Sequence, residues 1–155
     1  MKPLSEIEDG NDFSIPGRIK HEPLFNTQSK KADLVVLKAV DARPADKTMN
    51  LTTFRSEGQF NTIIYEEEDI YRGVKHRNVV FLSQNDMDRM QLQEGQKVIV
   101  QSKTGKMEVE VVLGPIRSGN CAMYWPEANV IVPRNIDPLS KTPSFKRVAI
   151  RISAL

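Results

Sequence analysis

The chain has 155 residues, of which 39% are hydrophobic, and this is enough for one domain with a buried core. Its 22 basic and 20 acidic residues are spread along the sequence and leave a net charge of +2, which argues against a broad nucleic-acid-binding surface. One cysteine, Cys121, excludes an internal disulfide, and with His21 and His76 it forms no zinc-binding spacing. No apolar run is long enough to span a bilayer and the first residues lack a signal-peptide pattern, so we expect a soluble, cytoplasmic protein.

The first part of the chain differs from the rest. Pro3, Pro16 and Pro23 interrupt a stretch with few periodic apolar positions, a composition typical of an extended arm. We therefore predict a linker over residues 1–32 and one domain over residues 33–155. The apolar residues 34–40 have the length and β-branching of a first strand of that domain.

Residues 51–62 combine a strand with a polar loop. Apolar and β-branched side chains over residues 51–54 predict the strand, which breaks at Ser56 and Gly58. Arg55 then offers a planar fork of donors, and Gln59 and Asn61 carry amides that donate and accept hydrogen bonds. This mixture suits a flat, polar, phosphorylated ligand. A loop that only caps and solvates the end of a strand has the same composition.

The middle of the chain alternates loops, strands and one helix. An acidic run at 66–69 and a basic run at 72–77 predict a long surface loop. An uninterrupted apolar strand follows over residues 78–82, and Ser83 offers an N-cap to a short helix over residues 84–90, with Asp86 in its first turn. Alternating strands around 98–100 and over 107–113 are joined by a hairpin turn.

The last part predicts further short strands. We expect them over residues 120–124 and 130–132, then a loop over 133–144 and a final strand over 147–152, with Val148, Ile150 and Ile152 facing inward. Six to eight short strands with one or two short helices predict a mainly β fold, a closed β-barrel with peripheral helices.

Four stretches together resemble the C-terminal, dinucleotide-binding domain of molybdopterin oxidoreductases, above all the alpha subunits of the formate-dehydrogenase-like branch. Residues 23–32 resemble the family's Phe-x-Thr-x-Ser-Gly-Lys-Ala segment, with Lys30 where glycine is usual. Residues 51–62 resemble its Leu-x-Thr-x-Arg-x-x-x-Gln-x-Asn-Thr motif, and residues 86–100 its helix, turn and strand. Residues 125–130 and 137–146 resemble its closing Pro-Glu-Ala-Asn and Thr-Pro-x-Phe-Lys motifs.

The resemblance implies a double-psi β-barrel with one or two short peripheral helices that binds molybdopterin guanine dinucleotide. A pyrophosphate needs arginine and backbone donors, and the edges of guanine and pterin need amides and carboxylates. The resemblance implies cofactor contacts, with Asp137 at the guanine edge, for nine side chains: Thr53, Arg55, Gln59, Asn61, Thr62, Asn129, Asp137, Phe145 and Lys146. Each has an ordinary alternative, such as a solvated charge for Lys146, a turn amide for Asn129 and a core side chain for Phe145.

In the resembling enzymes, residues of other domains hold the molybdenum or tungsten. The resemblance therefore implies that this chain binds no metal itself and does not catalyse a reaction alone. Cys121 lies among apolar residues, where we expect a buried hydrophobic side chain and not a metal ligand. The acidic run at 66–69 is a poor cation site because consecutive side chains alternate direction in an extended chain. We expect His76, between two basic residues, at the surface.

Three functions remain open. The first is a cofactor-binding domain of a larger oxidoreductase. The second is a small subunit that completes such an enzyme in trans. The third is a double-psi barrel that serves as a protein-interaction module. The expected partners of the chain under the first two are the remaining domains or the large subunit, with no nucleic acid and no membrane. The linker-like arm favours the first, and a stop codon close upstream of Met1 would favour the second. An interaction module has no need to gather Arg55, Gln59 and Asn61 around one opening.

Overall fold

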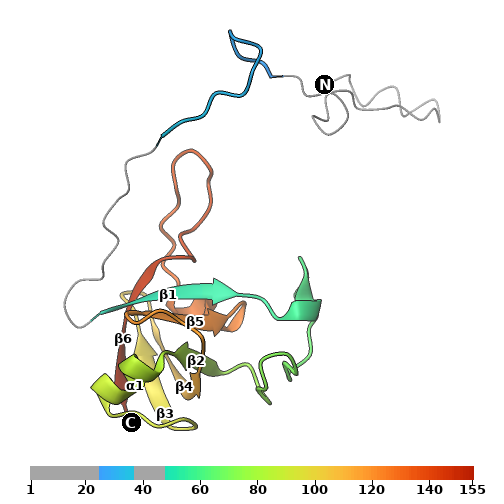
Figure 1. Ribbon diagram of the computed structural model, residues 1–155. Coiled ribbons are helices and arrows are strands. Elements are labelled where there is room, and N and C mark those ends of the chain that lie inside the picture. The colour runs from blue at the N-terminus through green and yellow to red at the C-terminus, as the bar shows by residue number, and fades with distance from the viewer. Residues whose placement is uncertain (1–24, 37–47) are drawn as a thin grey trace. The chain divides into compact units, whose positions relative to one another are not determined.

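The structure of the protein, a computed structural model, describes residues 25–36 and 48–155 (Figure 1). The chain divides into two compact units, Met1–Asp41 and Ala42–Leu155. Within the described residues, no helix is both long and apolar enough to cross a membrane.

The second unit is a closed barrel of six strands, visible in Figure 1 with one helix beside it. This confirms the predicted mainly β, double-psi barrel with a short peripheral helix. In their order around the barrel, the strands are β1 (Met49–Phe54), β5 (Asn120–Tyr124), β2 (Val79–Leu82), β4 (Lys106–Leu113), β3 (Lys97–Gln101) and β6 (Val148–Ala154), which pairs again with β1.

The directions of the strands bring four chain segments to one end of the barrel. β1 and β5 are parallel, with Phe54 opposite Tyr124 at their last residues. β2 runs antiparallel to β5, and β6 antiparallel to β1. The segments that follow β1 and β5, and those that precede β2 and β6, therefore all meet at this end, which we name the Phe54 end.

Strand β2 separates two apolar clusters because its side chains alternate between two faces. Val80 and Leu82 enter the main core inside the barrel. Val79 and Phe81 point the other way, into a small cluster with the ring of Tyr124. The ring of Phe54 lies 4.4 Å from that of Tyr124, measured between centroids, so aromatic packing joins the ends of β1 and β5.

Helix α1 (Gln84–Met90) has the predicted bounds. Ser83 is its N-cap and accepts a hydrogen bond from the backbone N–H of Asp86 at 3.2 Å. The helix ends at Gln91, whose φ of 55° is left-handed. Local signals therefore suffice to place this element.

The strand predicted over residues 130–132 is wrong. These residues belong instead to the 3₁₀ helix η3 (Glu127–Ile131) and its end. The N–H of Asn129 donates to the carbonyl of Pro126 at 2.9 Å, and that of Val132 to the carbonyl of Asn129 at 3.3 Å. Ile131 is fully buried. Ile131 and Val132 therefore fill the core from a helical turn, which needs no partner strand, whereas Val130 is exposed.

The strand predicted over residues 34–40 is also not found in its described part. Residues 34–36 have no regular structure, and the side chains of Leu34 and Val36 are 93% and 96% exposed. Residues 37–40 lie outside the described part of the chain. β-branched residues form a strand only where a neighbouring strand and a buried face are available, which explains the difference.

Residues 27–31 of the first unit form a tight turn. The N–H of Lys30 donates to the carbonyl of Thr27 at 3.2 Å, and the hydroxyl of Thr27 donates to the carbonyl of Lys31 at 2.6 Å. Lys30 has a φ of 57°, in the left-handed region that favours glycine. This conformation explains why the resembling family has glycine where this chain has lysine. The predicted division at residues 32 and 33 stays a prediction.

Candidate functional site

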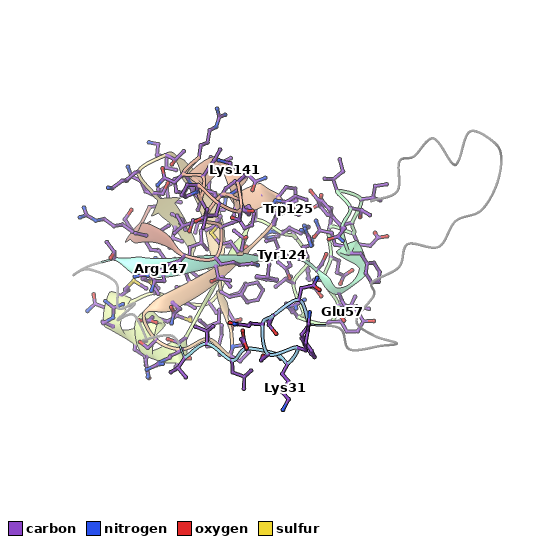
Figure 2. All side chains as sticks on the ribbon, turned by 90° about the horizontal axis from the view of Figure 1, so that it is seen from above. Lys31, Glu57, Tyr124, Trp125, Lys141 and Arg147 are labelled. Carbon is purple, nitrogen blue, oxygen red and sulfur yellow. The ribbon has the colours of Figure 1, made fainter. Side chains whose placement is uncertain are left out.

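An exposed cation and an exposed amide lie together beyond the ends of β1 and β5. Nη1 of Arg55 donates to Oδ1 of Asn61 at 2.9 Å. The same guanidinium lies over the ring of Trp125, 4.9 Å from its centroid. Figure 2 shows Trp125 next to Tyr124, close to the segment that carries Glu57. The indole ring and the amide together fix the plane of the Arg55 guanidinium.

A second cation reaches the same end of the barrel from the segment before β6. The N–H and the hydroxyl of Thr53 both donate to the carbonyl of Phe145, at 3.0 and 3.1 Å. Nζ of the exposed Lys146 donates to the carbonyl of Thr53. Phe145 is partly buried against the main core. The predicted residues Thr53, Phe145 and Lys146 therefore lie together beside Arg55.

Gln59 and Thr62 use their polar groups inside the chain. Gln59, the last residue of the short 3₁₀ helix η2 (Glu57–Gln59), is fully buried. Its Oε1 accepts from the N–H of Ser56 and from Arg77, and its Nε2 donates to the carbonyls of Thr62 and Trp125. The hydroxyl of Thr62 donates to the carbonyl of Gln59 at 2.7 Å. These bonds shape the loop, and contact of either residue with a cofactor stays a prediction.

Asn129 and Asp137 come from two other segments of the chain. Asn129 is exposed in η3. Asp137 is exposed in the loop over residues 133–144, where hydrogen bonds from Ser140, chiefly its N–H, and from the N–H of Leu139 lower the pKa of its carboxyl group. Among the described residues, no hydrogen bond or ion pair joins the side chain of Asn129 or Asp137 to the other seven predicted residues. Their roles at the cofactor stay predictions.

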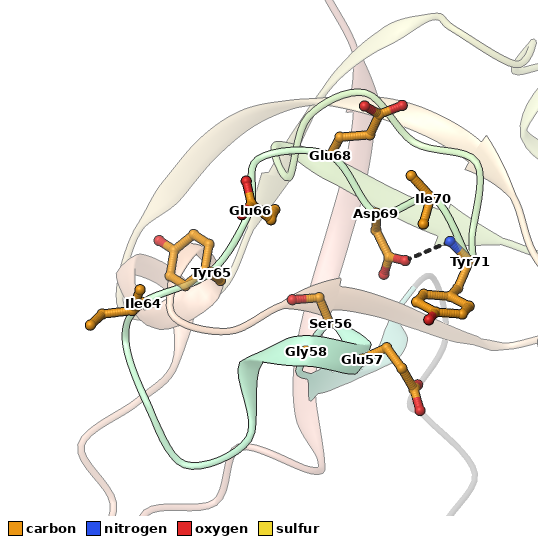
Figure 3. Close-up of a pocket in the computed structure, with 10 residues that line it drawn as sticks. All are labelled: Ser56, Glu57, Gly58, Ile64, Tyr65, Glu66, Glu68, Asp69, Ile70 and Tyr71. Carbon is orange, nitrogen blue, oxygen red and sulfur yellow. Dashed lines mark hydrogen bonds between the residues drawn. The ribbon is translucent and has the colours of Figure 1, made fainter.

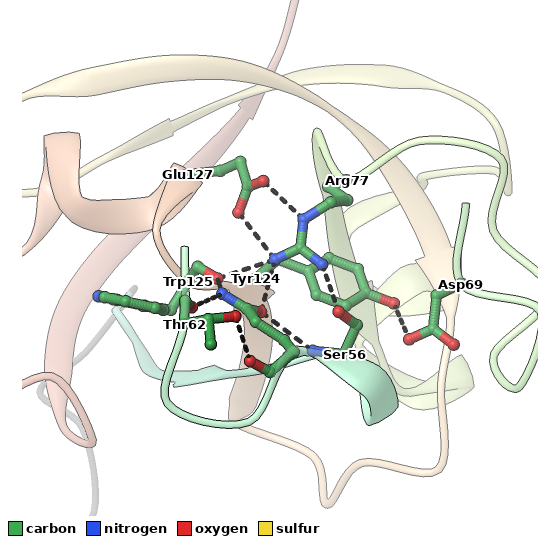
Figure 4. Close-up of polar contacts among 8 residues, drawn as sticks. Ser56, Thr62, Asp69, Arg77, Tyr124, Trp125 and Glu127 are labelled. Carbon is green, nitrogen blue, oxygen red and sulfur yellow. Dashed lines mark hydrogen bonds and ion pairs between the residues drawn. The ribbon is translucent and has the colours of Figure 1, made fainter. Parts of the chain in front are cut away.

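Arg77 is a buried residue of this end of the barrel that was not predicted from the sequence. Its place in a basic run predicts a solvated side chain, yet it is 1% exposed. Figure 4 shows its guanidinium between Glu127 and Ser56, and Nε donates to Oε1 of Glu127 at 2.6 Å. One signal was available, because Arg77 stands two residues before the buried strand β2.

Asp69 is a second buried charge in the predicted surface loop. Its Oδ2 accepts from the hydroxyl of Tyr124 at 2.8 Å and from Nη1 of Arg72 at 2.7 Å. Burial opposes ionisation of Asp69, but the hydrogen bonds from Arg72 and Tyr124 outweigh it and lower its pKa. No group of three or more His, Cys, Asp or Glu side chains in the described part of the chain is arranged to hold a metal ion.

A pocket of about 490 Å³ opens near this loop, but its charge does not fit a dinucleotide. Figure 3 shows its wall, where Asp69 accepts from the N–H of Tyr71. The acidic side chains that line it are Glu57, Glu66, Glu68 and Asp69. Such a wall repels a pyrophosphate. The two cations and the exposed amide at the Phe54 end fit one, because guanidinium, ammonium and amide groups are the donors that phosphate needs.

Known proteins share this sequence and fold. Residues 49–149 match the model of the family described as the molydopterin dinucleotide binding domain, that is, of molybdopterin dinucleotides. An uncharacterized oxidoreductase of Mycobacterium tuberculosis is 34% identical over 160 residues, which covers 94% of this chain and 20% of that protein. Protein YdeP of Escherichia coli is 31% identical over 144 residues, which covers 84% of this chain and 19% of that protein.

The structure of acetylene hydratase from Pelobacter acetylenicus is similar in fold. It matches with a TM-score of 0.53 at 12% identity, over 70% of this chain and 18% of that chain. The chain spans about a fifth of the length of the two relatives above. The family match covers most of the barrel, from β1 into β6, and includes Arg55, Asn61, Arg77 and Lys146. The chain thus belongs to the molybdopterin dinucleotide binding domain family of the molybdopterin oxidoreductases.

Proposed function

We propose that the barrel binds molybdopterin guanine dinucleotide as one domain of a larger, formate-dehydrogenase-like molybdenum or tungsten oxidoreductase of the cytoplasm. The observation that carries the proposal is the exposed guanidinium of Arg55, held by Asn61 and Trp125 at the Phe54 end. Lys146 adds a second positive charge at the same end. The bound cofactor supplies the redox chemistry, and this chain binds and orients it.

The polar groups at this end suit different parts of the cofactor according to their chemical type. Asn61 accepts from Nη1 of Arg55, so the guanidinium can direct its remaining N–H groups at the pyrophosphate oxygens. Lys146 serves phosphate as a point charge. The amides of Asn61 and Asn129 and the carboxylate of Asp137 are suited to the donor and acceptor edges of guanine and pterin. Thr53, Gln59, Thr62 and Phe145 hold these groups in place.

A subunit that completes such an enzyme in trans is the alternative. Against it stands the length of the relatives, which are about five times longer than the part that this chain matches. A purely protein-interacting barrel is disfavoured, because it has no use for a guanidinium whose plane is fixed by Asn61 and Trp125.

Titration with GDP and with pyrophosphate tests the proposal, with the emission of Trp125 as the signal. Trp125 is the only tryptophan of the chain, and its ring lies under Arg55. We expect weak binding, because a single domain supplies part of a pocket. Arg55→Ala removes a charge-assisted hydrogen bond worth about 1.5–3 kcal/mol, so affinity should fall about 10- to 100-fold.

Arg151→Ala is the matched control. Arg151 is an exposed arginine of β6, and it lies beyond Ile150, which is opposite Met49 at the start of β1. It therefore lies along β6 past the start of β1, away from the Phe54 end, and its removal should leave affinity unchanged. Equal weakening by both variants, or no response of the wild-type protein to millimolar GDP and pyrophosphate, would refute the proposed site.

A further inference from the structure

We propose that Arg77 positions the loop that presents Arg55 and Asn61, by fastening residues 56–65 to residues 125–127. The role of the loop in ligand binding rests on the proposed function. Arg77 is 1% exposed, so we assign it as a positioning residue and not a binding residue.

The guanidinium of Arg77 bonds to two segments that follow different strands. After β5, Nε and Nη2 donate to the carboxylate of Glu127 at 2.6 and 3.3 Å, and Nη2 donates to the carbonyl of Trp125 at 2.8 Å. After β1, Nη1 donates to the hydroxyl of Ser56 at 2.7 Å and Nη2 to Oε1 of Gln59 at 3.0 Å. One side chain therefore joins the two segments that form the site (Figure 4).

These hydrogen bonds fix the position of the loop because they are buried. The side chain of Arg77 is 1% exposed and that of Glu127 is 16% exposed, so water offers little replacement for a lost bond. The guanidinium also lies over the rings of Tyr65 and Tyr124, 3.8 and 4.5 Å from their centroids. Arg77 thus contacts the loop at its start, middle and end, through Ser56, Gln59 and Tyr65.

The same contacts reach the binding groups through one or two covalent or hydrogen-bonded steps. Ser56 is the neighbour of Arg55 in the chain, and Gln59 holds the carbonyl of Thr62, the neighbour of Asn61. Trp125 accepts from Arg77 through its carbonyl and supports Arg55 with its ring. The amide of Asn61 and the indole of Trp125 both support the Arg55 guanidinium, and Arg77 holds the segments that carry them.

Lysine cannot replace this arrangement. An ammonium group on a flexible stem preserves the charge opposite Glu127, but it lacks the planar fork that reaches several acceptors in different directions. The ring over which Arg77 lies in β5, that of Tyr124, belongs to the small cluster with Val79 and Phe81 and not to the main core inside the barrel. Arg77→Lys should therefore leave the barrel folded and loosen the loop.

Hydrogen exchange of the ligand-free protein measures the loop directly. The N–H groups of Gln59 and Thr62 donate within the loop, at 3.2 and 3.1 Å, and amides in the ladder of β3 and β4 serve as the reference. In Arg77→Lys we expect the two loop amides to exchange about tenfold faster, because net loss of one hydrogen bond is worth about that factor. The emission of Trp125 should shift, and GDP affinity should fall about tenfold.

Two further variants define the result. Arg89→Lys is the control, since Arg89 pairs with Asp86 on α1 and is 57% exposed; it should change none of these readings. Ser56→Ala removes one bond of Arg77, but also the capping contact of the Ser56 side chain with the N–H of Gln59, so only the N–H of Thr62 is read in this variant. That amide should exchange faster than in wild type by a smaller factor than in Arg77→Lys, which preserves the test if Arg77→Lys unfolds.

Three outcomes would overturn the inference. Loop exchange and Trp125 emission could remain at wild-type values in both Arg77→Lys and Ser56→Ala. The reference amides could accelerate as much as the loop amides, which would make Arg77 a residue of general stability. GDP affinity could stay within twofold although the loop loosens. If the wild-type protein binds no GDP, the proposed function fails, and loop exchange still decides whether Arg77 holds the loop.

Discussion

Asp86→Asn tests whether a buried carboxylate fastens α1 to the connection before β5. Asp86 is fully buried, and its Oδ1 accepts from Arg89 at 2.8 Å and from the hydroxyl of Ser118 at 3.0 Å. Its Oδ2 accepts from the hydroxyl of Ser83 at 2.7 Å and from the N–H of Gly119 at 2.8 Å. All four partners are donors, so a carboxylate suits the site and an amide does not.

The geometry sets the size of the effect. The amide nitrogen of asparagine will take the place of Oδ1, because the Ser118 hydroxyl can turn to accept and Arg89 is exposed enough to regain water. The amide oxygen then keeps Ser83 and Gly119 as donors. The variant loses the charge of the acceptor and a partly exposed ion pair, which together are worth about 2–3 kcal/mol of unfolding free energy.

Urea unfolding at neutral pH measures this loss. With a slope of about 2 kcal/mol per M, the midpoint of Asp86→Asn should fall by about 1–1.5 M. Asp88→Asn is the matched control on the same helix. Asp88 is exposed and accepts from Gln84 at 2.7 Å, so its variant should stay within about 0.5 kcal/mol of wild type.

The pH dependence gives a second test with a definite sign. Burial opposes ionisation of Asp86, but hydrogen bonds from Arg89, Ser83, Gly119 and Ser118 outweigh it and hold its pKa below the ordinary value of 3.8. The stability contributed by its charge is therefore complete above pH 3.8 and is lost as the pH falls through the lower folded pKa. A difference between wild type and Asp86→Asn that shrinks already between pH 7 and 5, or a loss equal to that of Asp88→Asn, would refute this reasoning.

Three other predictions concern single contacts. Tyr124→Phe removes a hydrogen bond to the buried Asp69 carboxylate and should lower the unfolding free energy by about 1.5–3 kcal/mol in urea. Cys121 is 1% exposed and burial raises the pKa of its thiol, so an aromatic disulfide reagent should react with it only after denaturation. Gly105→Ala places a Cβ 2.5 Å from the carbonyl oxygen of Val130 and should lower the thermal midpoint, with a cost of about 1–3 kcal/mol.

The fold was predictable where the signal is local. Ser83 and Asp86 define the start of α1 within a few residues, and the strand over residues 120–124 has the predicted bounds. The pairing of the strands is not local, because β1 lies beside β5, about 70 residues away. The resemblance to a family implied a double-psi barrel, and the order of its strands was not predicted. The apolar residues 130–132 failed as a strand because burial alone does not distinguish a helical turn from a strand.

The site divides in the same way. The Arg55 and Asn61 pair was predicted to lie at one opening, and the two side chains are in contact. Arg77 and Asp69 were missed because each stands in a run of like charges, which is typical of solvated loops. Their burial depends on Glu127 and Tyr124, more than 45 residues further along the chain, and no local pattern reports such a partner.

Polar side chains at this end of the barrel therefore fall into two groups. In one group all hydrogen-bonding atoms already have partners within the chain, and in the other some donors remain available. Every buried side-chain nitrogen and oxygen in the described residues has a partner, which includes the amide of Gln59 and the guanidinium of Arg77. Arg55 and Lys146 are exposed and keep donors beyond the bonds they make within the chain. The binding free energy of a ligand is most favourable at groups that are held in place and still have free donors. Binding there requires no further ordering of the side chain and breaks no existing hydrogen bond. Under the proposed function, we therefore expect the exposed cations to bind the ligand and the buried network beneath them to fix the positions of those cations.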